Sequence, residues 1–156
     1  MRKSRIVFAL LSAAILLVCG YQYSYEMTLQ NSDFLKWCHT LTDDIWFAWI
    51  SVGDPPEDLD YELSNDEIQE LVGILNGLTA EDLYLSKDYP YASRENLNLM
   101  VVVDHDLECD FVYLPEAPEE LYIRFTGQDT FGRYRYLKTT NQNLLAFILS
   151  HEPTQY

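Results

Sequence analysis

Four consecutive runs in the second half of the chain alternate apolar and polar residues with a period of two. They read NLNLMVVV, CDFVYLP, ELYIRFTG and GRYRYLKT, and they begin at Asn96, Cys109, Glu120 and Gly132. Turn-forming segments separate them, namely DHDL, residues 115–118 and GQDTF. Because alternation places every second side chain on the same face of a strand, this succession predicts an antiparallel β-meander.

The first half contains helical patterns instead. In LSNDEIQELVGILNG, Ser64 and Glu67 have the spacing of a capping box, and one apolar stripe precedes Gly77: Ile68, Leu71, Val72, Leu75. Similar spacing predicts short helices near residues 33–41 and 141–151. The aromatic and β-branched run at residues 45–52 favours a buried strand, with a helix as the alternative.

These elements together predict an α+β fold for residues 26–156, which are long enough for a single domain. We expect an antiparallel sheet of about five strands with helices packed on one face. Residues 1–25 precede this domain and have a different character.

The N-terminal segment has the layout of an export signal or a single-pass membrane anchor. Arg2, Lys3 and Arg5 precede an apolar or small run at residues 6–18. The run is shorter than the roughly 20 residues that span a bilayer. Three fates stay open: a retained anchor, a cleaved signal, and a lipoprotein with Cys19 as the lipid-bearing residue. In each case the preceding cations place the C-terminal domain outside the cell membrane.

The exported part is strongly acidic. Three of the ten Lys and Arg residues lie in the N-terminal segment, which leaves seven against 25 Asp and Glu, and no Lys or Arg stands between Lys36 and Lys87. Nucleic acids and anionic lipid surfaces are bound through Lys and Arg, so we expect no nucleic-acid partner. Contact with the membrane is expected through the N-terminal segment only.

The segment DHDLECD contains candidate metal ligands. Its acids at alternate positions, Asp104, Asp106, Glu108 and Asp110, resemble the first half of a calcium loop. The second half does not fit, because Cys109 and Pro115 occupy the positions of the turn glycine and the closing glutamate. We favour a solvated hairpin tip, with Asp106 and Leu107 in the bend and with Glu108 and Asp110 in water. A weak calcium site is the alternative.

A zinc site is a more distant hypothesis. His105 and Cys109 supply two ligands, and Cys38 and His39 would have to complete the set from a remote part of the chain. The same two cysteines have another interpretation. In an oxidising exterior Cys38 and Cys109 either form a disulfide or remain separate buried side chains.

The segment GRYRYLK is the candidate ligand-binding strand. Arg133 and Arg135 alternate with Tyr134 and Tyr136. On an exposed strand these side chains would suit an anionic ligand or a sugar, since guanidinium groups fork onto anions and aromatic rings stack. The alternative is that the tyrosines pack on the helices and the arginines pair with acids.

Catalytic motifs are not recognisable in the sequence. It contains no GxSxG, HExxH, GxxxxGK or GxGxxG pattern. Paired carboxylates of the kind used in glycoside hydrolysis are not identifiable among so many acids. The sequence therefore favours a binding protein over an enzyme.

The layout as a whole resembles small exported or membrane-anchored proteins of unknown function from Gram-positive bacteria. The likeness rests on the N-terminal segment, the FLKW helix, the I-x-x-A-x-I strand, LSNDEIQELVGILNGL, the meander and the final NLLAFIL helix. It implies an extracytoplasmic domain whose role is uncharacterised. From the residues we expect a binding or protein-interaction domain tethered at the cell envelope, with an envelope protein or a small ligand as its partner. A small envelope hydrolase with paired carboxylates and an accessory or sensor subunit of a membrane complex are the alternatives.

Overall fold

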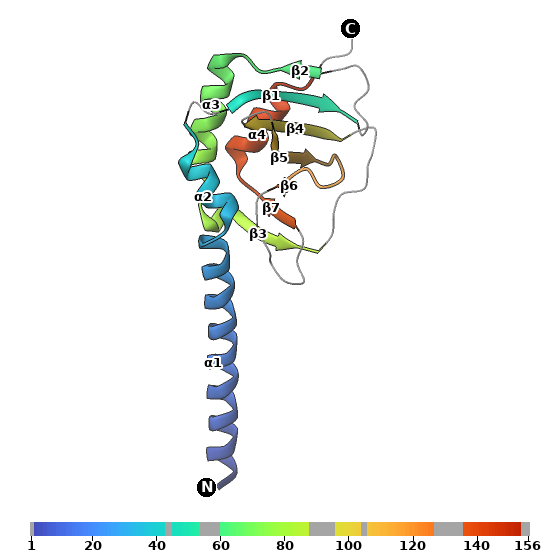
Figure 1. Ribbon diagram of the computed structural model, residues 1–156. Coiled ribbons are helices and arrows are strands. Elements are labelled where there is room, and N and C mark those ends of the chain that lie inside the picture. The colour runs from blue at the N-terminus through green and yellow to red at the C-terminus, as the bar shows by residue number, and fades with distance from the viewer. Residues whose placement is uncertain are drawn as a thin grey trace.

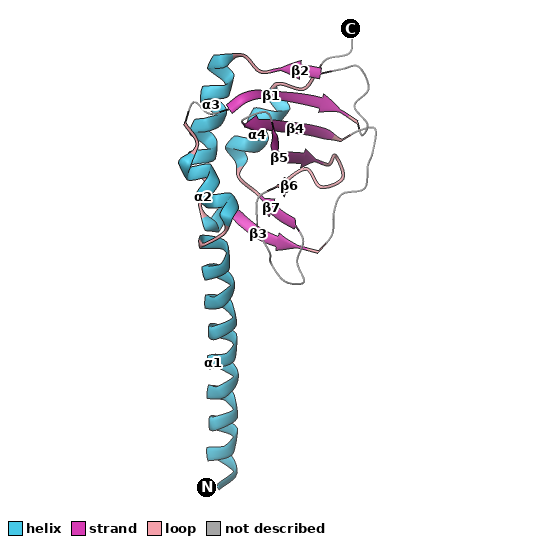
Figure 2. Ribbon diagram, in the orientation of Figure 1, coloured by secondary structure: helices cyan, strands magenta, loops and turns pink. Residues whose placement is uncertain are grey.

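The computed structural model describes residues 2–42, 45–53, 60–87, 96–103, 106–126 and 136–153. Its elements follow the order helix, helix, two strands, helix, five strands, helix, with a 3₁₀ turn before the third strand (Figures 1 and 2). The helices are α1 (Arg2–Gln30), α2 (Asp33–Thr40), α3 (Asn65–Asn76), η1 (Ala80–Asp82) and α4 (Gln142–Ser150). The strands are β1 (Ile45–Val52), β2 (Asp60–Glu62), β3 (Leu83–Ser86), β4 (Leu97–Val103), β5 (Asp106–Tyr113), β6 (Leu121–Phe125) and β7 (Tyr136–Thr139).

The strands form one antiparallel sheet in the order β2-β1-β4-β5-β6-β7-β3. The predicted α+β class and the meander from β4 to β7 are therefore confirmed. Within the described residues the sheet has seven strands rather than about five, because β2 and β3 extend its two edges. Each of these is only three or four residues long, and each is held by pairing with β1 or β7, which a local sequence pattern does not reveal.

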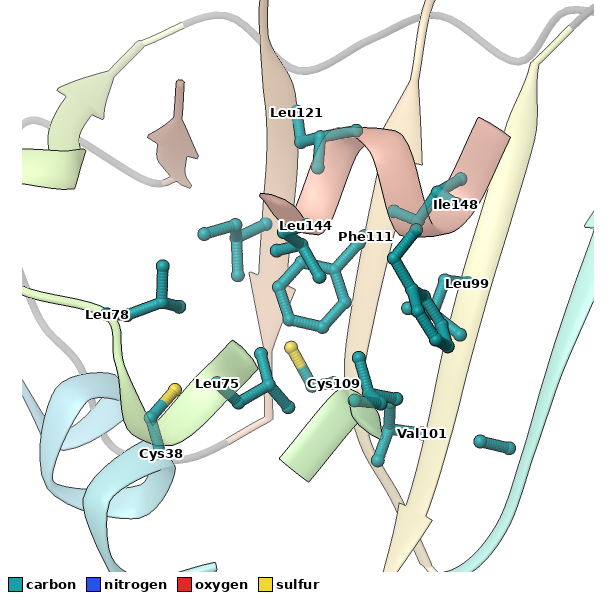
Figure 3. Packing of buried hydrophobic residues seen from close by; sticks show 14 of the residues in the cluster. Cys38, Leu75, Leu78, Leu99, Val101, Cys109, Phe111, Leu121, Leu144 and Ile148 are labelled. Carbon is teal, nitrogen blue, oxygen red and sulfur yellow. The ribbon is translucent and has the colours of Figure 1, made fainter. Parts of the chain in front are cut away.

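The helices cover one face of the sheet. Their apolar side chains form a single core with the alternate strand residues that face them, including Leu99, Val101, Phe111 and Ile123. Figure 3 shows Phe111 and Cys109 of β5 directed toward Leu75 of α3 and Leu144 of α4. A second, smaller cluster on the other face consists of Val112, Leu114 and Tyr122, none of which is in a helix. We call this second face the outer face.

Local signals position the main helices as expected. Ser64 and Glu67 form the reciprocal capping box of α3, and Asn141 caps α4 by accepting from the backbone N–H of Leu144. At the end of β1, Gly53 has a φ of 88°, in the left-handed region that glycine adopts without steric cost. Its N–H donates to the carbonyl of Asn96, which aligns β1 with β4.

α1 is a single helix that extends away from the sheet and helices (Figure 1). The expected boundary between residues 25 and 26 lies inside it. Near its C-terminal end Leu29 is only 2 % exposed in the core, and the hydroxyl of Tyr25 accepts a 2.8 Å hydrogen bond from the backbone N–H of Leu85 in β3. Within the described residues, no helix combines the length and the apolar content that a membrane crossing requires.

Candidate functional site

The segment DHDLECD lies at the β4–β5 connection. Asp104 and His105 are outside the described residues, whereas Asp106 and Leu107 belong to β5 and pair with Val103 and Val102. The prediction that Asp106 and Leu107 form the bend is therefore wrong. β5 begins earlier than expected because a register irregularity opposite Val101 and Val102 accommodates an extra residue.

Asp110 does not project into water, contrary to our expectation. Its side chain is 3 % exposed, and its Oδ2 lies 2.6 Å from the guanidinium of Arg124 on the neighbouring strand β6. The register places these two residues directly opposite each other, so the buried carboxylate is neutralised across the strand pair. This contact gives the Oδ2 atom of Asp110 a cationic partner.

No group of three or more His, Cys, Asp or Glu side chains in the described part of the chain is arranged to hold a metal ion. The calcium hypothesis also involves Asp104, which lies outside the described residues, and the side chains of Asp106 and Glu108, which are likewise not described. Of the proposed zinc ligands, His39 contacts the carbonyl of Leu78 at 2.8 Å through Nε2. His39 is thus engaged in joining α2 to the end of α3.

Cys38 and Cys109 are thiols in the structure, and both are completely buried in the core. Burial raises the pKa of Cys38 far above its usual value, which keeps the thiol protonated and unreactive. Both therefore act as small apolar side chains in this arrangement (Figure 3). Cys19, the candidate lipidation site, is exposed on α1.

Of the candidate ligand-binding strand, Arg133, Tyr134 and Arg135 lie outside the described residues. Tyr136 begins β7 and pairs with Ser86 of β3. Its neighbour Leu137 belongs to the helix-covered core, so strand alternation places Tyr136 on the outer face. The alternative in which Tyr136 packs on the helices is therefore wrong.

Tyr136 shares the outer face with four residues that we call the outer-face cluster: Tyr84, Glu120, Tyr122 and Lys138. Cross-strand pairing brings Tyr122, Lys138 and Tyr84 into one row across β6, β7 and β3. The amino group of Lys138 lies 2.8 Å from Glu120 and 4.1 Å from the ring centroid of Tyr122. The Lys138 side chain is 14 % exposed and that of Glu120 is 33 % exposed, so this ion pair is partly removed from water.

In the outer-face cluster, Glu120 and Lys138 stabilise each other's ionised forms. Lys138, and then Tyr84, hold the pKa of Glu120 below its usual value. Burial alone would lower the pKa of Lys138, but the contacts with Glu120 and Tyr122 outweigh burial and raise it. Burial, followed by the nearby carboxylate of Glu120, raises the pKa of Tyr84. At neutral pH the cluster is therefore a charged pair beside the protonated Tyr84, which suits recognition rather than proton transfer.

A second cluster of polar side chains connects β2, α3 and α4. The carboxylate of Glu67 accepts from the hydroxyls of Tyr61 and Ser64 at 2.8 and 2.7 Å, and it lies 3.1 Å from Nε2 of His151. The Ser64 hydrogen bonds, then Tyr61 and His151, lower the pKa of Glu67 to about 2. The carboxylate lies between the serine and the histidine, so His151 is not placed to activate Ser64, which caps α3 instead.

Three of the described carboxyl groups do not show the pattern of a general acid. The pKa values of Glu67, Asp82 and Glu120 are each lowered from the usual value. For Asp82, burial opposes this shift, but hydrogen bonds from Thr79 and Asn141 outweigh it. A hydrolytic acid requires a raised pKa near neutrality.

Two surface grooves lie away from the outer-face cluster. One of about 480 Å³ runs between α1 and the segment formed by η1 and the start of β3, and another of about 380 Å³ lies between α3 and α4. The first is lined in part by Tyr25, Glu26, Glu81 and Leu83, and the second in part by Glu70 and Phe147.

Sequence reasoning did not identify the outer-face cluster. Its residues come from three strands and one turn that are separated by up to 54 positions, from Tyr84 to Lys138. The only local signal is the alternation of Tyr122 and Lys138 with apolar neighbours, which predicts a shared face but not their contact.

Comparison with known proteins gives no relative. No protein family matches this chain, and no curated protein or solved structure is significantly similar to it.

Proposed function

We propose that the chain is an extracytoplasmic binding or protein-interaction domain that its N-terminal helix tethers at the cell envelope. The proposal rests on the two different parts of α1, an exposed apolar part and a C-terminal end that packs against the domain. We call the second part the docked end. Seven large apolar side chains of the exposed part are 55–74 % exposed: Val7, Leu10, Leu11, Ile15, Leu16, Leu17 and Val18. Exposed apolar surface of this extent on one element is typical of contact with lipid or another protein.

Charge supports an orientation for the tether. Arg2, Lys3 and Arg5 precede the apolar stretch, and every Asp and Glu of the chain follows it. This asymmetry favours the orientation in which the basic leading end stays in the cytoplasm and the acidic domain lies outside.

The docked end supports a fixed connection between tether and domain. Tyr25 contacts β3 and Leu29 enters the core, and only Asn31 and Ser32 separate α1 from α2. A domain joined so closely to its tether is presented in one orientation, which favours repeated contact with a partner at the same surface.

The state of three described carboxylates favours binding over hydrolysis. Glu67, Asp82 and Glu120 are stabilised in their ionised forms by local hydrogen bonds. The outer-face cluster instead offers aromatic rings beside a partly desolvated ion pair, a combination that suits polar or sugar-like ligands.

Fractionation of cells that express the full chain tests the tether. We expect the wild-type protein in the membrane pellet and its domain open to protease added outside spheroplasts. The double variant Leu16→Asp/Leu17→Asp should move to the soluble fraction, because both side chains are more than 70 % exposed and face whatever covers α1. Gln22→Glu, at an exposed position of the same helix outside the apolar stretch, is the matched control. A wild-type chain in the soluble fraction, or a domain protected from external protease, would contradict the proposal.

A further inference from the structure

The groove between α1 and β3 lies along an edge of the sheet. β3 pairs with β7 on one side and is the last strand in the sheet order. The C-terminal part of α1 runs beside the start of β3 (Figure 1), and the two elements together with η1 line the groove of about 480 Å³. Leu83, the first residue of β3, lines the groove, so the groove adjoins the beginning of this sheet edge.

The backbone of Leu85 faces this surface. In an antiparallel strand, consecutive residues direct their N–H and C=O groups to opposite sides. The N–H of Leu85 donates to the Tyr25 hydroxyl at 2.8 Å, so it points away from β7 and toward α1. A single side-chain hydroxyl thus occupies a position at which a further strand would form ladder hydrogen bonds.

The lining of the groove suits a particular side-chain chemistry. Glu26 and Glu81 are both exposed at the groove, and none of the described residues that line it is Lys, Arg or His. The nearest apolar surface comes from Leu29, Ala80 and Leu83. An extended chain that alternates basic and apolar residues would meet the two carboxylates with one set of side chains and the apolar floor with the other.

We propose that this groove binds an extended, basic segment of a partner protein, which adds to the edge of β3 that pairs with no other described strand and takes the place of the Tyr25 hydroxyl at Leu85. The sheet edge supplies backbone hydrogen bonds, and Glu26 and Glu81 select for Lys or Arg. The inference rests on the protein-interaction role proposed above and names the surface that performs it. It does not depend on how the chain is held at the envelope.

Binding of a designed peptide to the full chain in detergent tests this inference. The probe is a fluorescent eight-residue peptide that alternates Lys and Val, and fluorescence anisotropy at low salt reports its affinity. A version with every backbone nitrogen methylated keeps the side chains and charges but has no N–H groups. We expect saturable binding of the first peptide and at least tenfold weaker binding of the second. Equal binding of both peptides, or no saturable binding, would overturn the inference.

Variants of the groove separate charge from strand pairing. Glu26→Gln and Glu81→Gln should each weaken binding about twofold to fivefold, the usual effect of an exposed charge pair. Tyr25→Phe should strengthen it by a similar factor, because the Leu85 N–H no longer has to exchange partners. Glu70→Gln, in the α3–α4 groove, is the matched control and should leave affinity unchanged. Equal effects at Glu70 and Glu81 would show a general charge attraction and would overturn the site.

Amide hydrogen exchange gives a measurement that needs no variant. The Leu85 amide should exchange more slowly when the peptide is bound, and unchanged exchange at β3 would contradict strand addition. Failure of the peptide to bind would reject this surface alone, whereas fractionation and external protease test the proposed function independently.

Discussion

The two faces of the sheet are built from the same alternating strands, but different interactions stabilise them. On the helix-covered face Leu99, Phe111 and Ile123 are buried among apolar helix residues. On the outer face Asp110 pairs with Arg124, and Glu120 pairs with Lys138 beside Tyr122. The first face depends on apolar area and shape, whereas the second depends on partners that must stay charged. The difference predicts how each face responds to truncation and to pH.

Phe111→Ala should have the largest effect. Phe111 is completely buried and packs edge-on against Phe34 of α2 at a centroid distance of 6.1 Å. Its truncation leaves a cavity between sheet and helices and should lower the free energy of unfolding by about 3–5 kcal/mol. Urea denaturation measures this loss. Phe111→Leu, which keeps most of the volume, should cost about 1 kcal/mol. A small effect of the alanine variant would show that the helices repack over β5.

Arg124→Ala should have the next largest effect. It leaves the carboxylate of Asp110 buried without its cation, at a cost of about 2–3 kcal/mol, less than for a fully buried pair because Arg124 is half exposed. The double variant Asp110→Leu/Arg124→Met should recover most of this stability, since apolar replacements of a buried pair are often neutral. If the double variant is as unstable as the single one, the pair contributes more than charge balance.

Lys138→Met should cost less, about 1–2 kcal/mol. It removes the contacts with Glu120 and with the Tyr122 ring but keeps the length of the side chain. Thermal unfolding compares it with Lys36→Met, because Lys36 makes an exposed pair with Asp33 on α2 and its replacement should be nearly neutral. Equal effects at the two positions would mean that partial burial adds nothing to the Lys138 pair.

The smallest effect expected is a change in the pH dependence of stability. The pKa of Glu120 is lowered in the folded protein, so its contribution is complete above its ordinary pKa and is lost as pH falls through the folded value. Glu120→Gln should therefore reduce the slope of unfolding free energy against pH below about pH 5. Phe111→Leu, on the other face, should leave that slope unchanged. Denaturation at a series of acidic pH values checks both.

The fold was largely predictable because its main signals are local. The capping box of Ser64 and Glu67 and the apolar stripe that follows it set α3 without reference to the rest of the chain. The four alternating runs likewise set the meander, since hairpins join strands that are neighbours in sequence. β3 escaped prediction because four residues acquire strand structure only by pairing with β7, which lies 50 to 56 positions later in the chain.

The candidate site was much less predictable. The sequence placed Asp110 in a segment of acids and suggested a solvated tip, but the register opposite Arg124 buries it. It also drew attention to Tyr136 as part of a tyrosine and arginine pattern, without indicating that Lys138, Tyr122 and Glu120 would lie on the same face. Long-range register determines these contacts, and the alternation of a strand does not specify which strand lies beside it.

The amino-acid sequence by itself determined the helices, the meander, the acidic charge and the apolar N-terminal helix, because hydrophobic period, capping and charge act over a few neighbouring residues. The tertiary structure alone decided which face Tyr136 and Asp110 occupy, how Tyr25 of α1 reaches Leu85, and that β3 ends the sheet beside a groove with two carboxylates. Those features arise where distant segments meet, and their free energy comes from burial and pairing that exist only once the chain has folded.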